Sequence, residues 1–420
     1  MNPIRMHCLA ATTAALALWS VPAAAQQTDE PTTEGAAAAN ARRSVSFLDL
    51  TASVGYGTNP FLSFGDSNGS AYGRVGARGV HTWVTERTSA SVSGFAEGST
   101  YFNDYGFKSI FSLTGDVQHQ ASEKVTVFGS AGVSGDLSGQ LSNRFLYVPP
   151  GPEVPDPTIP LPPTSVQDPD LFSFAGRQYR VYGQAGAAFR TSARSTISVS
   201  GGASRVFFTD DLLNDYTTVF ANGAYNHTLS ERTTIGVNVR GERTEYSKSS
   251  DNSTIINPSF TINTRLSEYW DVSGAIGLVY SSFDRAGETS HSTGLSLDGS
   301  ICHNSETERL CGRLSRNAQS LSRGELVNTT TASLEWYKKL DEKQTLQASV
   351  GVTRYSTKNS VIDNFSSNYF RASVSYSRVI NGRISGGADL SARLLRSEGP
   401  DPDADINGSL FLRYRLGDLG

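Results

Sequence analysis

Leu-Ser-Glu-Arg-Thr-Thr-Ile-Gly-Val, at Leu229–Val237, is one copy of a phrase that recurs along the whole chain. Each copy is a polar turn with an acid, a base or both, followed by alternating small and apolar residues. The usual interval is about 37 residues, which predicts two strands, a tight turn and a loop, the unit of an up-and-down β-barrel. The eight copies lie at Thr85–Val92, Ala121–Val127, Thr191–Val199, Leu229–Val237, Leu266–Val272, Ser305–Gly312, Leu340–Leu346 and Ile380–Gly386.

The N-terminus has the features of a secretory signal. Arg5 precedes the apolar run Leu9–Trp19, and Ala23–Ala25 is a small-residue cleavage site, so residues 1–25 are predicted to be a signal peptide. The alternative, a transmembrane anchor, is disfavoured because the run is well short of roughly 20 residues. Residues 26–43 are predicted to be a flexible periplasmic segment, and residues 44–420 an outer-membrane barrel.

The amino-acid composition is compatible with two classes of β protein. The formal net charge of −4 gives no reason to expect a nucleic-acid partner. Only 38% of residues are hydrophobic, while Gly is abundant at 40 residues, which favours β structure. A secreted soluble sandwich and a membrane barrel both fit these values.

Alternation and strand length favour the barrel. In Asp271–Asp284, the residues Val272, Ile276 and Leu278 share one face, and Ile406–Leu416 shows the same pattern. Eight turns with a strand on each side give sixteen strands, and an opening strand at Ser44–Gly57 and a closing strand at Ala404–Leu416 raise the count to eighteen. Sixteen stays open, because Leu310–Ser322 and Leu326–Leu340 are the weakest strand patterns.

Aromatic residues predict the membrane interfaces. Trp83, Trp270 and Trp336 all lie beside turns, which predicts a girdle at the periplasmic end. A second girdle is predicted at the loop end from Tyr101, Phe102, Phe207, Phe208, Tyr280, Phe283, Phe365, Tyr369 and Phe370.

One connection breaks the repeat. Residues 138–171 are predicted to form a long extracellular loop; they contain nine of the sixteen prolines, most of them in Val148–Pro163. Proline has no N–H to donate to a ladder, so an extended segment is expected. Three interpretations remain open: the loop folds into the lumen as a constriction, it caps the mouth of the barrel, or it is a solvated surface loop.

Cys302 and Cys311 flank one turn on the same predicted face. Cross-strand neighbours in an oxidising compartment predict a disulfide. Metal binding by Cys302, His303 and Cys311 is the weaker alternative, because that set matches no standard site. No metal and no cofactor are predicted.

The lumen face is the candidate functional surface. Alternation assigns to it Arg74, Arg78, Arg180, Arg240, Arg313, Arg371, Arg393, Arg413, Glu97, Asp116, Glu242, Asp298, Glu335 and Asp389. These charges either pair and solvate an aqueous pore, or the arginines attract an anionic solute. A Ser-His-acid site would need a His and a Ser on neighbouring strands at the outer rim of the barrel. The GxSxG motif is absent, so no enzyme and no catalytic residue are predicted.

Gly55–Phe61 and the turns Leu229–Thr233 and Leu340–Lys343 resemble the β-barrel porin-2 group of outer-membrane proteins. That resemblance implies a link to exopolysaccharide gene clusters and transfers no catalytic residue. The alternating segment Gly408–Leu416 is similar to an insertion signal for the barrel-assembly machinery, although the chain lacks a terminal Phe.

The sequence therefore predicts a β-barrel in the outer membrane of a Gram-negative bacterium, with lipid and the assembly machinery as partners. The leading expectation is a conduit for surface polysaccharide, working with periplasmic export proteins. A diffusion porin for small solutes is the first alternative, and a non-transporting adhesion or assembly barrel is the second.

Overall fold

The structure is a computed structural model. It describes residues 44–63, 69–103, 105–137, 177–249, 251–285, 287–321, 326–356, 366–397 and 401–417. All of these belong to one compact unit, residues 42–420. The predicted signal peptide (1–25), periplasmic segment (26–43) and Pro-rich loop (138–171) lie outside the described residues.

The described chain is built from antiparallel strands. The strands are β1 (Val45–Gly57), β2 (Ser70–Val84), β3 (Thr88–Tyr101), β4 (Gly106–Ser122), β5 (Val125–Leu137), β6 (Arg177–Arg190), β7 (Ser195–Phe208), β8 (Tyr216–Ser230), β9 (Thr233–Tyr246), β10 (Asn252–Arg265), β11 (Trp270–Arg285), β12 (Glu288–Asn304), β13 (Glu308–Ser320), β14 (Leu326–Lys339), β15 (Gln344–Ser356), β16 (Ser366–Val379), β17 (Ile384–Ser397) and β18 (Asp405–Gly417). Within the ranges given above, no helix is long and apolar enough to cross a bilayer.

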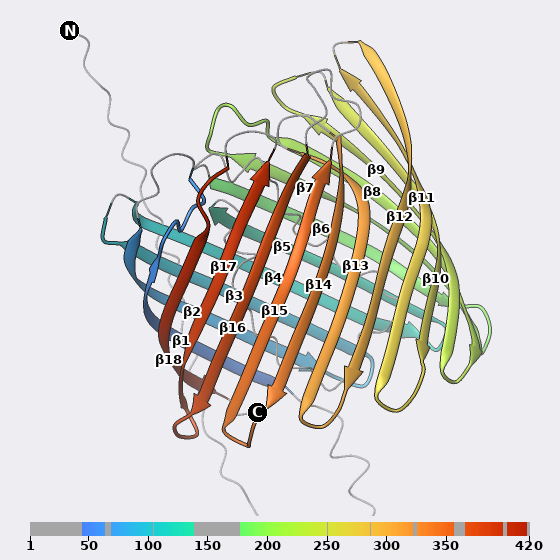
Figure 1. The fold of residues 1–420 in the computed structure, drawn as a ribbon. Coiled ribbons are helices and arrows are strands. Elements are labelled where there is room, and N and C mark those ends of the chain that lie inside the picture. The colour runs from blue at the N-terminus through green and yellow to red at the C-terminus, as the bar shows by residue number, and fades with distance from the viewer. Residues whose placement is uncertain are drawn as a thin grey trace, which may run out of the picture. The chain divides into compact units, whose positions relative to one another are not determined.

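Each strand pairs with its neighbours in the chain, and β18 pairs with β1, so the sheet closes on itself. Figure 1 shows β18, in red, beside β1, in blue. The prediction of eighteen strands is confirmed, and the alternative of sixteen is wrong, because both weak segments form strands (β13 and β14).

The repeated phrase is explained by its turns. In every copy a Ser, Thr, Asp or Asn side chain accepts a hydrogen bond from a backbone N–H two or three residues later, which fixes a tight reversal. The accepting residues are Thr85, Ser122, Ser192, Ser230, Ser267, Ser305, Asp341 and Asn381. All eight turns therefore lie at one end of the barrel, which we call the turn end.

The outer face is apolar along alternate positions. Val75, Val239, Leu278, Leu390 and Leu410 are each more than half exposed. Water would penalise such a surface, whereas lipid does not, and closure of the barrel pairs the first strand with the last. The protein is thus a closed barrel whose outer face suits a lipid bilayer, as the predicted outer-membrane location requires.

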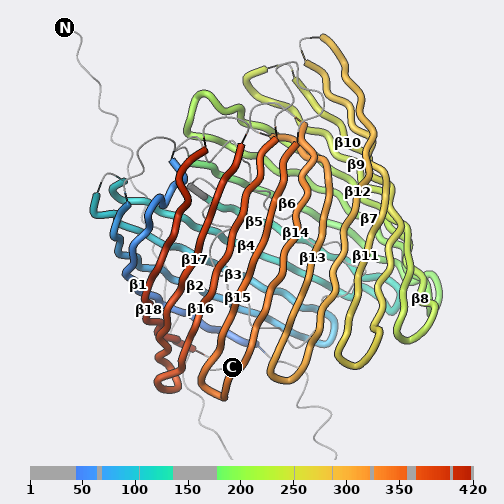
Figure 2. Tube along the Cα trace, viewed as in Figure 1, coloured from blue at the N-terminus to red at the C-terminus, as the bar shows by residue number. Residues whose placement is uncertain are grey.

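One seam is incomplete. The ladder between β12 and β13 runs from the turn end only to Leu297 and Arg316, although β12 continues to Glu288. The β11–β12 hairpin consequently extends beyond its neighbours at the loop end (Figure 2). At the turn end of the same seam, Cys302 and Cys311 oppose each other and their sulfurs are bonded.

The closing seam carries a charged clamp. Arg415 of β18 donates from Nε and Nη2 to the Asp49 carboxylate of β1, at 2.7 and 2.8 Å. Asp49 is 4% exposed, so this pair is largely shielded from solvent.

Candidate functional site

The register places the predicted lumen residues Arg74, Arg240 and Asp389 on the inward face, and the other eleven lumen assignments remain predictions from alternation. The apolar residues directly before or after them in the chain, such as Val75 beside Arg74, Val239 beside Arg240 and Leu390 beside Asp389, point outward. The inward face therefore carries the charges and the outward face carries the apolar side chains.

Several inward charges compensate one another within the wall. Arg240 Nη2 lies 3.0 Å from Glu242 Oε2, and Arg393 Nη2 lies 2.6 Å from Asp405 Oδ2. Arg74 Nε lies 3.8 Å from Glu97 Oε1. These arginines are held by acids of the protein, which weakens the interpretation that they attract an anionic solute.

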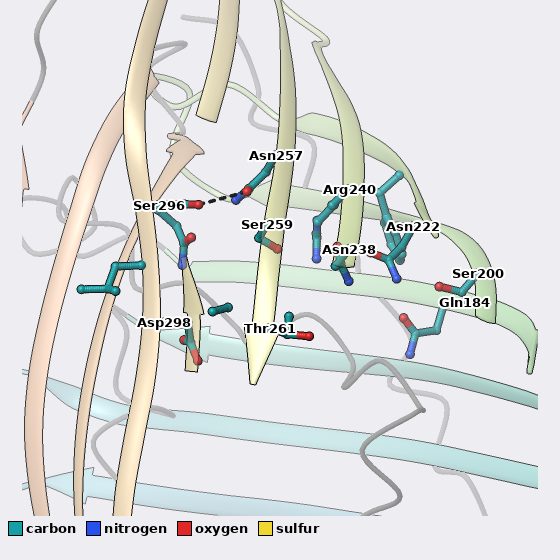
Figure 3. Close-up of a pocket in the computed structure, with 14 residues that line it drawn as sticks. Gln184, Ser200, Asn222, Asn238, Arg240, Asn257, Ser259, Thr261, Ser296 and Asp298 are labelled. Carbon is teal, nitrogen blue, oxygen red and sulfur yellow. Dashed lines mark hydrogen bonds between the residues drawn. The ribbon is translucent and has the colours of Figure 1, made fainter. Parts of the chain in front are cut away.

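A polar cavity of about 350 Å³ opens on the lumen wall between β6 and β13. We call it the amide cavity. Its amide side chains are Gln184, Asn222, Asn238, Asn257 and Asn317, and its hydroxyl side chains are Ser200, Ser259, Thr261 and Ser296. Figure 3 shows most of these side chains on neighbouring strands around a shared space.

Register explains how the amide cavity arises. Ser200 pairs with Asn222, Asn222 with Arg240, and Arg240 with Asn257, so four strands contribute one transverse row. Adjacent members of such a row are about 4.8 Å apart, the spacing of neighbouring strands. Ser296 Oγ donates to Asn257 Oδ1 at 3.0 Å, which joins β12 to the row.

A local irregularity lies at the floor of the cavity. The β10–β11 ladder omits Asn257 and Pro258, because proline cannot donate and interrupts the pairing. Opposite this point, a Cβ added to Gly277 would lie 2.2 Å from the Pro258 carbonyl oxygen. Gly277 is required here, since only its bare backbone permits this close approach.

The charges of the amide cavity are balanced. Its lining includes one cation, Arg240, and one anion, Asp298. Arg240 is oriented by Glu242 and by the Phe220 ring, whose centroid lies 5.1 Å from the guanidinium carbon. An anionic solute would therefore meet no unpaired countercharge at Arg240.

Two side chains of the amide cavity lack partners. Asn222 Nδ2 and Ser200 Oγ are shielded from solvent and make no hydrogen bond within the structure. An unmet hydrogen-bonding group is costly and is unusual in a native protein.

The loop after β1 folds inward at the loop end. Residues Thr58–Ser63, which we call the anchored turn, include Asn59, whose backbone N–H donates to Asp405 and whose amide bonds Ser63 and Asp403. Arg393 donates to Asp405 and, at 2.7 Å, to the Pro60 carbonyl. The Asn59-Pro60-Phe61 segment noted in the sequence is thus the centre of a buried hydrogen-bond network.

Aromatic side chains pack around the anchored turn. Phe61 contacts Tyr101 at a ring-centroid distance of 5.1 Å, and Leu62 packs with Tyr355 and Tyr369. The prediction that Tyr101 and Tyr369 belong to an outer girdle is wrong, because both are buried inside the barrel around this turn. Phe102, Tyr280 and Phe370 are exposed, and Phe365 lies outside the described residues.

The three predicted girdle tryptophans lie at the turn end. Trp83 and Trp270 are exposed on the outer face, and Trp336 Nε1 donates to Glu308 Oε1 at 2.6 Å. A hydrogen-bond acceptor for the indole N–H, such as this carboxylate, is compatible with a position at the level of the lipid headgroups.

No catalytic or metal constellation is assembled in the described ranges. Three imidazoles at the turn end bond hydroxyls across a strand pair: His81 with Ser46, His119 with Thr88 and His227 with Ser195. The described structure gives none of these three a carboxylate partner, as a Ser-His-acid site requires. The described residues contain no group of three His, Cys, Asp or Glu able to hold a metal ion.

Sequence reasoning missed part of the site. Asn257, Asn317 and Asp405 follow the same alternation that identified the charged lumen residues, so their period-two positions could have revealed them. The anchored turn had no such signal, because its partners Arg393 and Asp405 lie more than 300 residues away in sequence.

Comparisons with known proteins add only similarities of fold. No family model matches the chain, and no curated protein matches it. OccAB3 of Acinetobacter baumannii is 10% identical with a TM-score of 0.44, covering 89% of this chain and 99% of that one. OccK2 (OpdF) of Pseudomonas aeruginosa is 10% identical with a TM-score of 0.46, covering 89% and 98%. OccK1 (OpdK) of the same species is 11% identical with a TM-score of 0.45, covering 89% and 99%. The strand count and closure rest on this chain's own hydrogen-bonded ladders.

Proposed function

We propose that the barrel is a passive channel for small polar solutes. The observation that supports this most is the inward wall, which is polar, carries charges of both signs, and pairs several of them within the wall. Such a wall hydrates a lumen without presenting one dominant charge. Lipid against the outer belt, and the barrel-assembly machinery acting on β18, are the proposed partners.

Single-channel recording in planar bilayers tests the proposal. The purified full-length protein should give a stable conductance without any added polymer, with weak preference between K⁺ and Cl⁻. A barrel that folds but gives no conductance would contradict it.

A second candidate is a conduit for surface polysaccharide that works with periplasmic export proteins. The row of amide and hydroxyl groups in the amide cavity favours it, since such groups bind sugar hydroxyls in both directions. Deletion of the gene should then trap polymer in the periplasm. Normal secretion together with an absence of conductance would leave an adhesion or assembly role.

A further inference from the structure

Amide and hydroxyl side chains dominate the lining of the amide cavity. Most of its lining can both donate and accept hydrogen bonds, because amides and hydroxyls have both kinds of group. Guanidinium and carboxylate groups, by contrast, only donate or only accept. A ligand matched to this lining presents donors and acceptors together.

The charged residues of the lining disfavour an anionic ligand. Arg240 is engaged by Glu242 and stacked on Phe220, and Asp298 is the one acid of the lining. A carboxylate or phosphate ligand would have to compete with Glu242 for Arg240 and would face Asp298. A neutral ligand meets neither cost.

Two atoms without hydrogen-bond partners also favour a ligand that carries hydroxyl groups. Asn222 Nδ2 and Ser200 Oγ belong to side chains that face each other across β7 and β8, and neither has a hydrogen-bond partner. A small rotation of either side chain presents it to a ligand hydroxyl, which would satisfy a group that the protein leaves unmet.

We infer that the amide cavity is a binding site for an uncharged, polyhydroxylated solute, with a neutral sugar as the ligand class. This inference rests on the proposed channel function and deepens it by naming a preferred solute. A cavity of about 350 Å³ is within the range of small-ligand sites.

Calorimetric titration of the detergent-solubilised full-length barrel tests this. The probes are maltose and maltobionate, which are similar in size; in maltobionate the reducing-end glucose is an open chain whose C1 is a carboxylate. Maltose should bind more tightly than maltobionate. Asn222→Leu should weaken maltose binding about ten-fold, since it removes hydrogen bonds and leaves sugar hydroxyls unpaired.

Asn226→Leu is the matched control, because Asn226 lies on the same strand and the same face as Asn222 but outside the cavity. Ser200→Ala is a second, conservative variant in case Asn222→Leu folds poorly, and it should also weaken maltose binding. Equal weakening by Asn226→Leu, tighter binding of maltobionate, or no maltose binding would overturn the inference.

Conductance recorded in parallel separates the two proposals. Wild-type conductance without maltose binding defeats the sugar site and leaves the channel intact. Maltose binding that depends on Asn222, in a barrel without conductance, supports the sugar site and defeats the channel function.

Discussion

The wall formed by β15–β18 and β1–β3 holds the anchored turn, whereas the wall formed by β6–β13, on the other side of the strand order, holds the amide cavity. Around the anchored turn, Asn59, Arg393 and Asp405 are buried and bonded to one another or to backbone. Among the described residues, the β6–β13 wall instead includes Ser198, Ser200 and Asn222, each with a buried side-chain atom that makes no hydrogen bond.

This difference separates two uses of inward polar residues. A complete network holds one conformation, because breaking any bond exposes a buried polar group to a cost. An incomplete network leaves capacity for a ligand. Removal of an inward polar group should therefore reduce stability on the first wall and leave it nearly unchanged on the second.

The largest effect is expected at the anchored turn. Asp405→Ala leaves the Arg393 guanidinium buried without its acid, which should lower the free energy of unfolding by about 3–5 kcal/mol. Urea unfolding of the reconstituted barrel measures this. Asp401→Ala is the control at the same end, because it breaks the exposed Arg396–Asp401 pair and should cost less than about 1 kcal/mol. Similar losses in both variants would contradict the distinction.

The next effect concerns the disulfide bond in the cavity wall. Replacing Cys302 and Cys311 together by Ser should cost about 2–3 kcal/mol, because the bond closes a short loop in the unfolded chain. The same urea titration, with and without reductant, checks it. Wild type should lose this amount on reduction, and the double variant should not respond to reductant at all.

A smaller effect compares single hydroxyls on the two walls. Tyr72→Phe removes the 2.7 Å bond from the Tyr72 hydroxyl to Asn407 Oδ1 and should cost about 1 kcal/mol. Ser200→Ala removes a hydroxyl that has no partner and should cost close to nothing. If Ser200→Ala destabilised the barrel as much as Tyr72→Phe, the cavity wall would be a satisfied structural network.

The smallest effect lies outside both walls, at the exposed turn residue Asp341. The backbone N–H of Lys343 lowers the pKa of Asp341 below the ordinary value of 3.8. A depressed pKa contributes stability above the unfolded value, and this is lost as pH falls through the folded value. Asp341→Asn keeps the turn's hydrogen-bond acceptor, as Asn381 does. As pH falls below 3.8, the urea midpoint of the variant should therefore decrease slightly less than that of wild type. A large change near neutral pH would contradict this assignment.

Sequence patterns predicted the fold because period two and turn chemistry are local. Ser230 and Asp341 reveal their turns within three residues, and Leu410 and Leu412 reveal the outer face. Eighteen strands followed from counting such signals.

The finer features depend on contacts that the local pattern does not contain. In the sequence, Tyr101 is an aromatic residue at a strand end whether its ring faces a lipid headgroup or Phe61. The inward course of the anchored turn determines which of the two it contacts. The amide cavity likewise depends on the register among β7, β8, β9 and β10, which aligns residues that alternation alone leaves unordered.

The Asp49–Arg415 clamp has a consequence for the order of folding. Its two residues are 366 positions apart, so it can form only when the last strand meets the first. Until then the sheet has two unpaired edges, and closing so long a loop carries the entropy of the whole intervening chain. A slip of one residue would turn Arg415 to the opposite face and separate the charges. The clamp therefore acts late, as a check on the register of closure, and it retains a closed barrel more than it hastens its formation.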